Sequence, residues 1–174
     1  MPCIGINFEV IVFAQSLKSS VDLDGTIFET HYNLGIAYTQ AEKYPEAVET
    51  FENAIKLRPD FADAYYSLAV AQENFAKGVV DGTLKKADKD DKDDADEAQE
   101  APKTVDADGV PAKKVLTKEE KAQAAELFEA SIKSYETYLE KGQDIKDKAE
   151  VESKIEYLQK QVEKYSEAKP GSAE

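Results

Sequence analysis

Apolar and polar residues alternate with helical spacing along most of this chain. From Phe28, apolar side chains recur three or four residues apart as far as Tyr38, and a second run follows from Ala47 to Ile55. Pro59 cannot continue a helix, so the second run is expected to end before it. The pattern predicts two helices joined by a short turn.

The same pattern returns at a fixed interval. An offset of 34 residues superposes Tyr32 on Tyr66 and Leu34 on Leu68. Repetition with a period of this size is typical of arrays in which each repeat is one helical hairpin. A single hairpin cannot bury its apolar face alone, so neighbouring hairpins are expected to stack.

The repeated positions resemble those of the tetratricopeptide repeat. The matching residues are Leu34, Gly35, Tyr38, Ala47, Phe51, Ala54 and Pro59, with His31 where the family often has Trp. The resemblance covers one full unit, residues 28–61. It implies an all-α fold, a short solenoid (an α-α superhelix) of helical hairpins in which small side chains allow close helix contact.

A second unit begins at residue 62 but is interrupted. Its first helix is expected over 62–77 and its second over 118–141, where Ala124, Phe128 and Ser131 take the repeat's positions. The stretch 78–117 between them has no aromatic residue and is rich in Asp and Glu. Such a composition cannot bury enough apolar surface to offset the cost of ordering, so it predicts an acidic disordered insertion.

The two ends of the chain depart from the repeat. Residues 1–27 are assigned to a degenerate half repeat, a lone second helix followed by a turn. Residues 144–168 carry apolar side chains four and three positions apart and are expected to form a helix that caps the stack. A coiled-coil seam is the alternative interpretation of that helix. Residues 169–174 are expected to be a disordered tail.

Charge and cysteine content exclude some classes of function and indicate a cellular location. A net charge of −14 over 174 residues argues against nucleic-acid binding and against docking on anionic membranes. No run of about 18 apolar residues predicts membrane insertion. Cys3 is the single cysteine, which excludes an internal disulfide and favours a cytoplasmic location. The alternative is a periplasmic or exported protein, because "VIVFAQS" is similar to the end of a signal peptide.

The sequence offers no catalytic constellation. His31 is the only histidine and has no nucleophile nearby in sequence, and no glycine-rich phosphate loop is found. "DADGV" and "DLDGT" resemble the start of a calcium-binding loop, but neither loop has the glutamate that supplies its last ligands. We therefore expect no enzymatic activity, no cofactor and no metal site.

The family resemblance implies a concave groove lined by the first helix of each unit. Carried over to this chain, the groove positions are Glu29, Tyr32, Asn33, Ile36, Gln40, Asp63, Tyr66, Ser67, Val70 and Asn74. Tyr32 and Tyr66 are expected as binding anchors, or else as packing residues against neighbouring helices. Glu29 and Asp63 are expected to form an acidic edge that repels carboxylates.

These observations favour a non-catalytic adaptor, scaffold or assembly subunit. The predicted partner is a protein or peptide, neutral to basic, that is held by apolar side chains. One alternative is a structural protein that forms a homo-oligomer through the open N-terminal half repeat or the C-terminal helix. Another is an acidic chaperone or carrier for basic clients, which would use the charged insertion.

Overall fold

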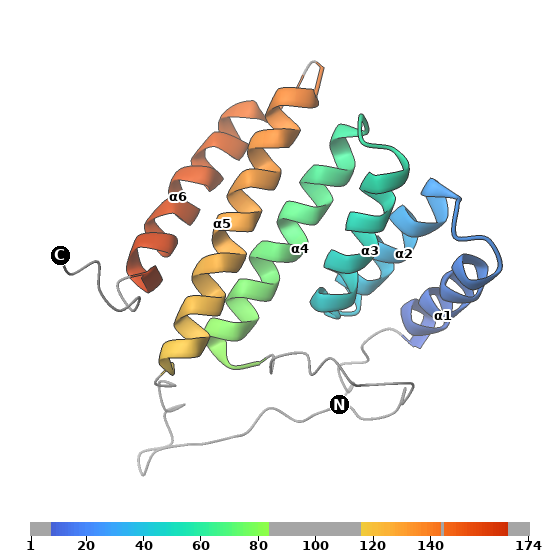
Figure 1. Cartoon of the computed structure of the whole chain (residues 1–174), viewed down its shortest axis with the longest axis horizontal. Coiled ribbons are helices and arrows are strands. Elements are labelled where there is room, and N and C mark those ends of the chain that lie inside the picture. The colour runs from blue at the N-terminus through green and yellow to red at the C-terminus, as the bar shows by residue number, and fades with distance from the viewer. Residues whose placement is uncertain (1–7, 84–115, 144, 167–174) are drawn as a thin grey trace, which may run out of the picture.

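The computed structural model describes residues 8–83, 116–143 and 145–166, and this part of the chain is all-α (Figure 1). Its helices are α1 (Phe8–Leu23), α2 (Phe28–Gln40), α3 (Tyr44–Leu57), α4 (Ala62–Asp81), α5 (Lys118–Lys141) and α6 (Lys148–Ser166). The predicted fold class, an all-α stack of helical hairpins, is confirmed. Most of the expected insertion, and the tail at 169–174, lie outside the described residues.

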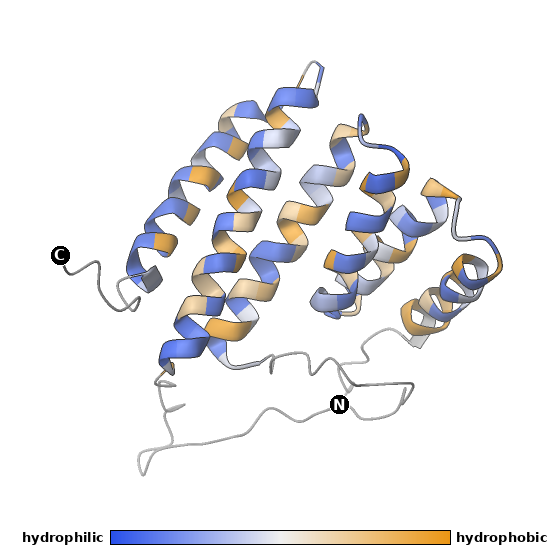
Figure 2. Cartoon of the chain, viewed as in Figure 1, coloured by the Kyte–Doolittle hydropathy of each residue, from blue (hydrophilic) through white to orange (hydrophobic). Residues whose placement is uncertain are grey.

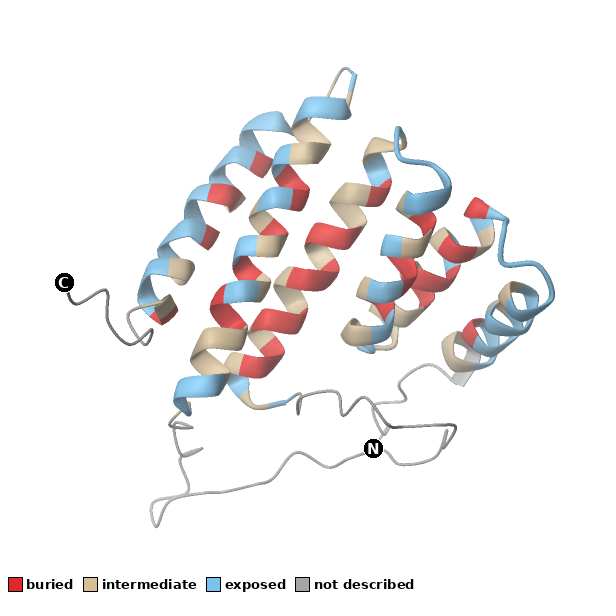
Figure 3. Cartoon of the chain, viewed as in Figure 1, coloured by how far each residue is buried: buried red, intermediate tan, exposed pale blue. Residues whose placement is uncertain are grey.

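The helices lie side by side in chain order, and each packs mainly on its neighbours in the sequence (Figure 1). Helices α2 and α4, the first helices of the two proposed units, are also in contact. The buried residues concentrate on the faces that the helices turn toward one another, whereas the outer faces of α1 and α6 are largely exposed (Figure 3).

Small side chains let the helices of the first hairpin approach closely. Gly35 of α2 lies against the ring of Phe51 in α3, which is only 1% exposed. Ala54 of α3 and Ala64 of α4 are both fully buried in a shared cluster with Phe28. Burial of a phenylalanine side chain contributes about 2 kcal/mol to the stability of the folded state, so these contacts stabilise the hairpin.

Helices α4 and α5 pack along each other although the segment 84–115 separates them in sequence. Three buried or part-buried hydrogen bonds cross between them. The Ser131 hydroxyl donates to the Ala69 carbonyl oxygen at 2.8 Å, Ser134 donates to the side chain of Gln72 at 2.9 Å, and the Tyr135 hydroxyl donates to the carboxylate of Glu73 at 3.0 Å. These contacts support our proposal that α4 and α5 are the two helices of one split repeat.

Local sequence signals determine where α5 begins and where α4 ends. Thr117 caps α5: its hydroxyl accepts from the Glu120 amide at 3.2 Å, while the Glu120 carboxylate accepts from the Thr117 amide at 2.9 Å. Helix α4 continues to Asp81, four residues beyond the expected end at residue 77. Val79 is 1% exposed and extends the packed face, and Gly82, at φ 74°, provides the left-handed residue that ends the helix.

Helix α6 closes one end of the stack. Val151, Ile155, Leu158 and Tyr165 are buried in the same cluster as residues of α5. Figure 2 shows hydrophobic colour on the inward side of α6 and hydrophilic colour elsewhere on it. The helix begins at Lys148, four residues after the expected start at 144, and residue 144 lies outside the described part. None of the described helices is long and apolar enough to cross a membrane.

Candidate functional site

A hollow of about 160 Å³ opens between α2 and α4. Five of the predicted groove positions line it: Ile36, Gln40, Tyr66, Ser67 and Val70. Thr39 and Phe51 complete its wall. The repeat period therefore brings half of the expected groove residues to one place, and the surface that they form is mainly apolar.

Tyr32 does not line this hollow. Its ring stacks on Phe28 at a centroid distance of 5.8 Å and meets Phe61 edge-on at 5.4 Å. The Tyr32 hydroxyl lies 3.2 Å from the Ser67 hydroxyl, so the side chain joins α2 to α4. Of the two roles considered for Tyr32, the geometry favours packing over an exposed anchor.

Tyr66 lines the hollow and also packs on the next helices. Its ring centroid lies 5.6 Å from that of Tyr135 and 5.2 Å from that of Tyr138, both on α5. Lys154 of α6 donates to the Tyr66 hydroxyl at 3.4 Å and lies 5.6 Å from the ring centroid. Tyr66 is therefore held in position by two neighbouring helices, α5 and α6, and also lines the hollow.

Lys154 was not expected at the groove. Burial by itself lowers the pKa of its ammonium group, but the hydrogen bond to Tyr66 and the negative charges of Glu73 and Glu150 raise it more, so the net shift of the pKa is upward. A positive charge therefore stands beside Tyr66. No sequence signal predicts this charge, because α6 lacks the repeat pattern that identifies groove positions in α2 and α4.

The remaining predicted positions do not line the hollow. Glu29 forms an exposed ion pair with Arg58 at 2.7 Å, and Arg58 also lies over the Phe28 ring at 4.2 Å. The pKa of Glu29 is lowered by a hydrogen bond within its own residue and by Arg58. Asn33 and Asp63 are exposed and Asn74 is half-buried. The expected acidic edge thus carries a counter-charge at Glu29.

The single histidine is a structural residue. His31 is 7% exposed, and its Nε2 lies 3.0 Å from the Gly25 carbonyl oxygen. Because a carbonyl only accepts, Nε2 carries the proton and donates this bond. Among the described residues, no group of three or more His, Cys, Asp or Glu side chains is placed to hold a metal ion.

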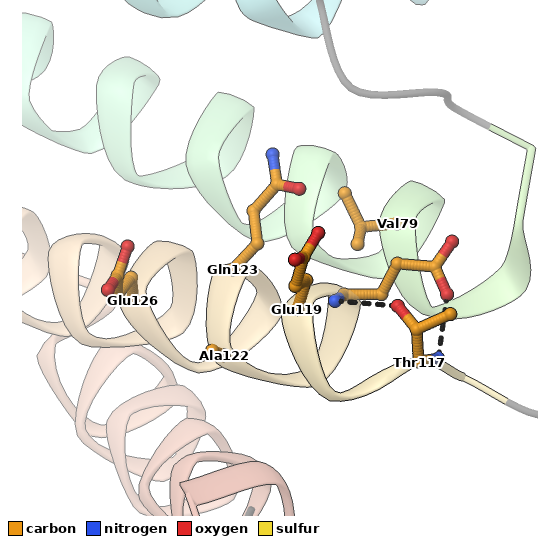
Figure 4. Close-up of a pocket in the computed structure, with 7 residues that line it drawn as sticks. Val79, Thr117, Glu119, Ala122, Gln123 and Glu126 are labelled. Atoms are coloured by element: carbon orange, nitrogen blue, oxygen red, sulfur yellow. Dashed lines mark hydrogen bonds between the residues drawn. The ribbon is translucent and has the colours of Figure 1, made fainter. Parts of the chain in front are cut away.

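A second hollow, of about 600 Å³, lies at the N-terminal end of α5 (Figure 4). Its lining residues are Val79, Thr117, Glu119, Glu120, Ala122, Gln123 and Glu126. The Glu120 carboxylate is held at the Thr117 cap, where it accepts a hydrogen bond from the Thr117 amide.

One comparison with known protein families gives a match in the region of the smaller hollow. Residues 37–74 match the family model of the TPR repeat, which takes in all of α3 and most of the residues around the hollow. Neither the curated proteins nor the solved structures contain a match to this chain. The family match and the hollow therefore coincide on the same pair of units.

Proposed function

Because the chain belongs to the tetratricopeptide-repeat family, we propose that it is a non-catalytic adaptor or assembly subunit that binds a protein partner. Members of this family generally serve as interaction modules rather than as catalysts. The proposed binding surface is the hollow between α2 and α4 together with the exposed groove positions around it. The partner would be an extended peptide or a helix.

The apolar hollow carries this proposal. Small-molecule sites usually have volumes of roughly 300–1,000 Å³, whereas this hollow measures about 160 Å³. It therefore suits one apolar side chain of a larger ligand better than a whole cofactor. Ile36, Phe51 and Val70 offer apolar contact, and Gln40 and Ser67 offer polar groups that can orient a peptide backbone.

Charge defines the class of ligand further. The chain carries a net charge of −14, and Asp63 is exposed beside the groove, so a strongly acidic peptide is disfavoured. Lys154 adds one local positive charge near Tyr66. We therefore propose a ligand that is neutral to basic overall, with an apolar anchor residue. A cytoplasmic location is also part of the proposal and rests on the sequence alone.

Selection from a random peptide library followed by calorimetry tests the proposal. Selected peptides should share an apolar residue and a net charge of zero or above. Val70→Asp places a charge in the hollow and should weaken their binding at least tenfold. Val80→Asp is the matched control: Val80 is also half-buried on α4 but does not line the hollow. Equal loss in both variants, or none in either, contradicts the groove assignment.

A further inference from the structure

Helix α1 is packed on one side only. Ala14, Leu17 and Val21 contact α2, in a cluster with Leu34 and Ala37. The opposite side, which we call the open face of α1, is exposed (Figure 3). Its members are Val12, Phe13, Ser16, Ser20 and Leu23, and the exposed fractions of its apolar side chains are 44% for Val12, 56% for Phe13 and 89% for Leu23.

The repeat shows that part of this face is covered by other helices in the equivalent helix α3. The 34-residue period places Phe13, Ser16 and Ser20 at the positions that Ala47, Thr50 and Ala54 occupy in α3. Those α3 residues are 0%, 8% and 0% exposed, because α2 and α4 pack on them. Three of the five positions are thus buried in α3 and open to solvent in α1, whereas Leu57, the equivalent of Leu23, is 41% exposed.

The open face can leave water at low cost. Between Val12 and Leu23 it contains no Asp, Glu, Lys or Arg, and Glu9, one turn before Phe13 on the same side of α1, marks its N-terminal end. The Ser20 hydroxyl donates to the Ser16 carbonyl oxygen at 3.1 Å within the same helix. Covering this hydroxyl therefore does not leave its donor without an acceptor, which removes the usual penalty for burying a polar group.

We propose that the open face of α1 binds the same face of a second copy of the chain, with the two helices antiparallel. Phe13 and Leu23 lie equally far from the middle of the face, and so do Ser16 and Ser20. A two-fold axis through that middle then places Phe13 against Leu23 of the second copy, while the small serines allow close approach at the centre. Two-fold interfaces require this kind of self-complementary order.

This surface is separate from the groove, so the inference does not depend on the proposed partner binding. A helix of 16 residues is about 24 Å long, and one face of it buries less than the roughly 800 Å² per partner of a standard interface. We therefore expect a weak dimer that forms only at high protein concentration.

Sedimentation equilibrium of the 174-residue chain, from about 1 µM to about 1 mM, tests the proposal. Phe13→Glu and Leu23→Lys should each weaken dimerisation at least tenfold. The double variant places opposite charges across the two-fold axis and should recover most of the wild-type affinity. Tyr157→Glu, at a side chain on α6 that is 50% exposed, is the control and should leave the dimer unchanged.

Three results would overturn the proposal. One is a monomer over the whole concentration range, which would leave the open face for another helix or for solvent. The second is a dimer that both single variants preserve, which would place the interface elsewhere. The third is a double variant that dimerises no better than either single variant, which would exclude the antiparallel arrangement. Circular dichroism checks that each variant is folded, as expected for substitutions at exposed positions.

Discussion

Gly35 and Phe51 are in such close contact that no other residue fits at position 35 without movement. A β-carbon placed on Gly35 would lie 2.7 Å from both Cδ1 and Cε1 of the Phe51 ring. The neighbouring atoms belong to a side chain that is 1% exposed, so the ring has little room to yield. This contact sets the separation of α2 and α3.

Gly35→Ala should therefore destabilise the protein. Overpacking of a core typically lowers stability by about 1–3 kcal/mol, while the better helix propensity of alanine offsets about 1 kcal/mol of that loss. We expect a net loss of about 1 kcal/mol in the free energy of unfolding, measured with urea. Gly25→Ala is the matched control, because a β-carbon there meets nothing closer than 3.4 Å.

A double-mutant cycle identifies the cause of that loss. Phe51→Leu shortens the side chain that Gly35→Ala would meet, so the two changes together should cost less than the sum of their separate costs. Additive losses would show that the position-35 side chain does not meet the Phe51 ring, and would contradict the contact as the reason for glycine.

The Tyr135 hydroxyl is expected to stabilise the packing of α5 on α4. It donates to Glu73, whose side chain is 12% exposed and also pairs with Lys77. Tyr135→Phe removes this hydrogen bond but leaves the ring and the Lys77 contact, so we expect a loss of about 1 kcal/mol in urea unfolding. Tyr157→Phe, on the exposed side of α6, should change the free energy of unfolding by much less.

The sequence predicts the core of the first unit well because its signals are local and periodic. Gly35 and Ala54 mark places where helices approach closely, and both lie at buried contacts in the structure. The same period brings Ile36, Tyr66 and Val70 to one hollow. Each of these predictions needs only the repeat and the geometry of a helical hairpin.

Contacts made by non-repeating parts of the chain could not be predicted in this way. Lys154 reaches Tyr66 from α6, which carries no repeat signature that would tell which of its faces meets α4. Arg58, the only arginine of the chain, neutralises Glu29 from a turn whose side-chain directions no periodic pattern fixes. The charges around the groove therefore emerge only from the folded arrangement.

The stability of the protein should fall at alkaline pH. Burial raises the pKa of the Tyr135 hydroxyl above its ordinary value of 10.0, and the neighbouring Glu73 carboxylate raises it further. A tyrosine whose pKa is raised by folding stabilises the folded state below pH 10. This stabilisation is lost as the pH rises, because the tyrosine ionises first in the unfolded state. The pKa of Lys154 is also raised, so Lys154 contributes in the same direction.

Urea unfolding at pH 8, 10 and 11 measures this effect. Above pH 10, the free energy of unfolding should fall less steeply with pH for Tyr135→Phe than for the wild type. The two slopes should differ by up to about 1.4 kcal/mol per pH unit, the value for one proton. Tyr157→Phe should keep the wild-type slope. If Tyr135→Phe keeps that slope as well, ionisation of Tyr135 is not coupled to unfolding.

The two helices of the proposed split repeat should remain associated when the chain between them is cut. Apolar packing along α4 and α5 and the hydrogen bonds from Ser131, Ser134 and Tyr135 do not depend on a continuous backbone. A specific protease site introduced within residues 84–115 would allow cleavage after folding. We expect the two fragments to elute together in size-exclusion chromatography in native buffer and to separate in urea.

The association of the fragments should also depend on the buried contacts rather than on charge alone. Phe128→Ala, at a side chain that is 2% exposed, should release the C-terminal fragment at a lower urea concentration, because truncation of a buried phenylalanine costs roughly 3–5 kcal/mol. Lys133→Ala, at an exposed position on α5, serves as the control. Fragments that separate in native buffer without any substitution would show that α4 and α5 need the connecting segment, and that they are not the two halves of a self-sufficient unit.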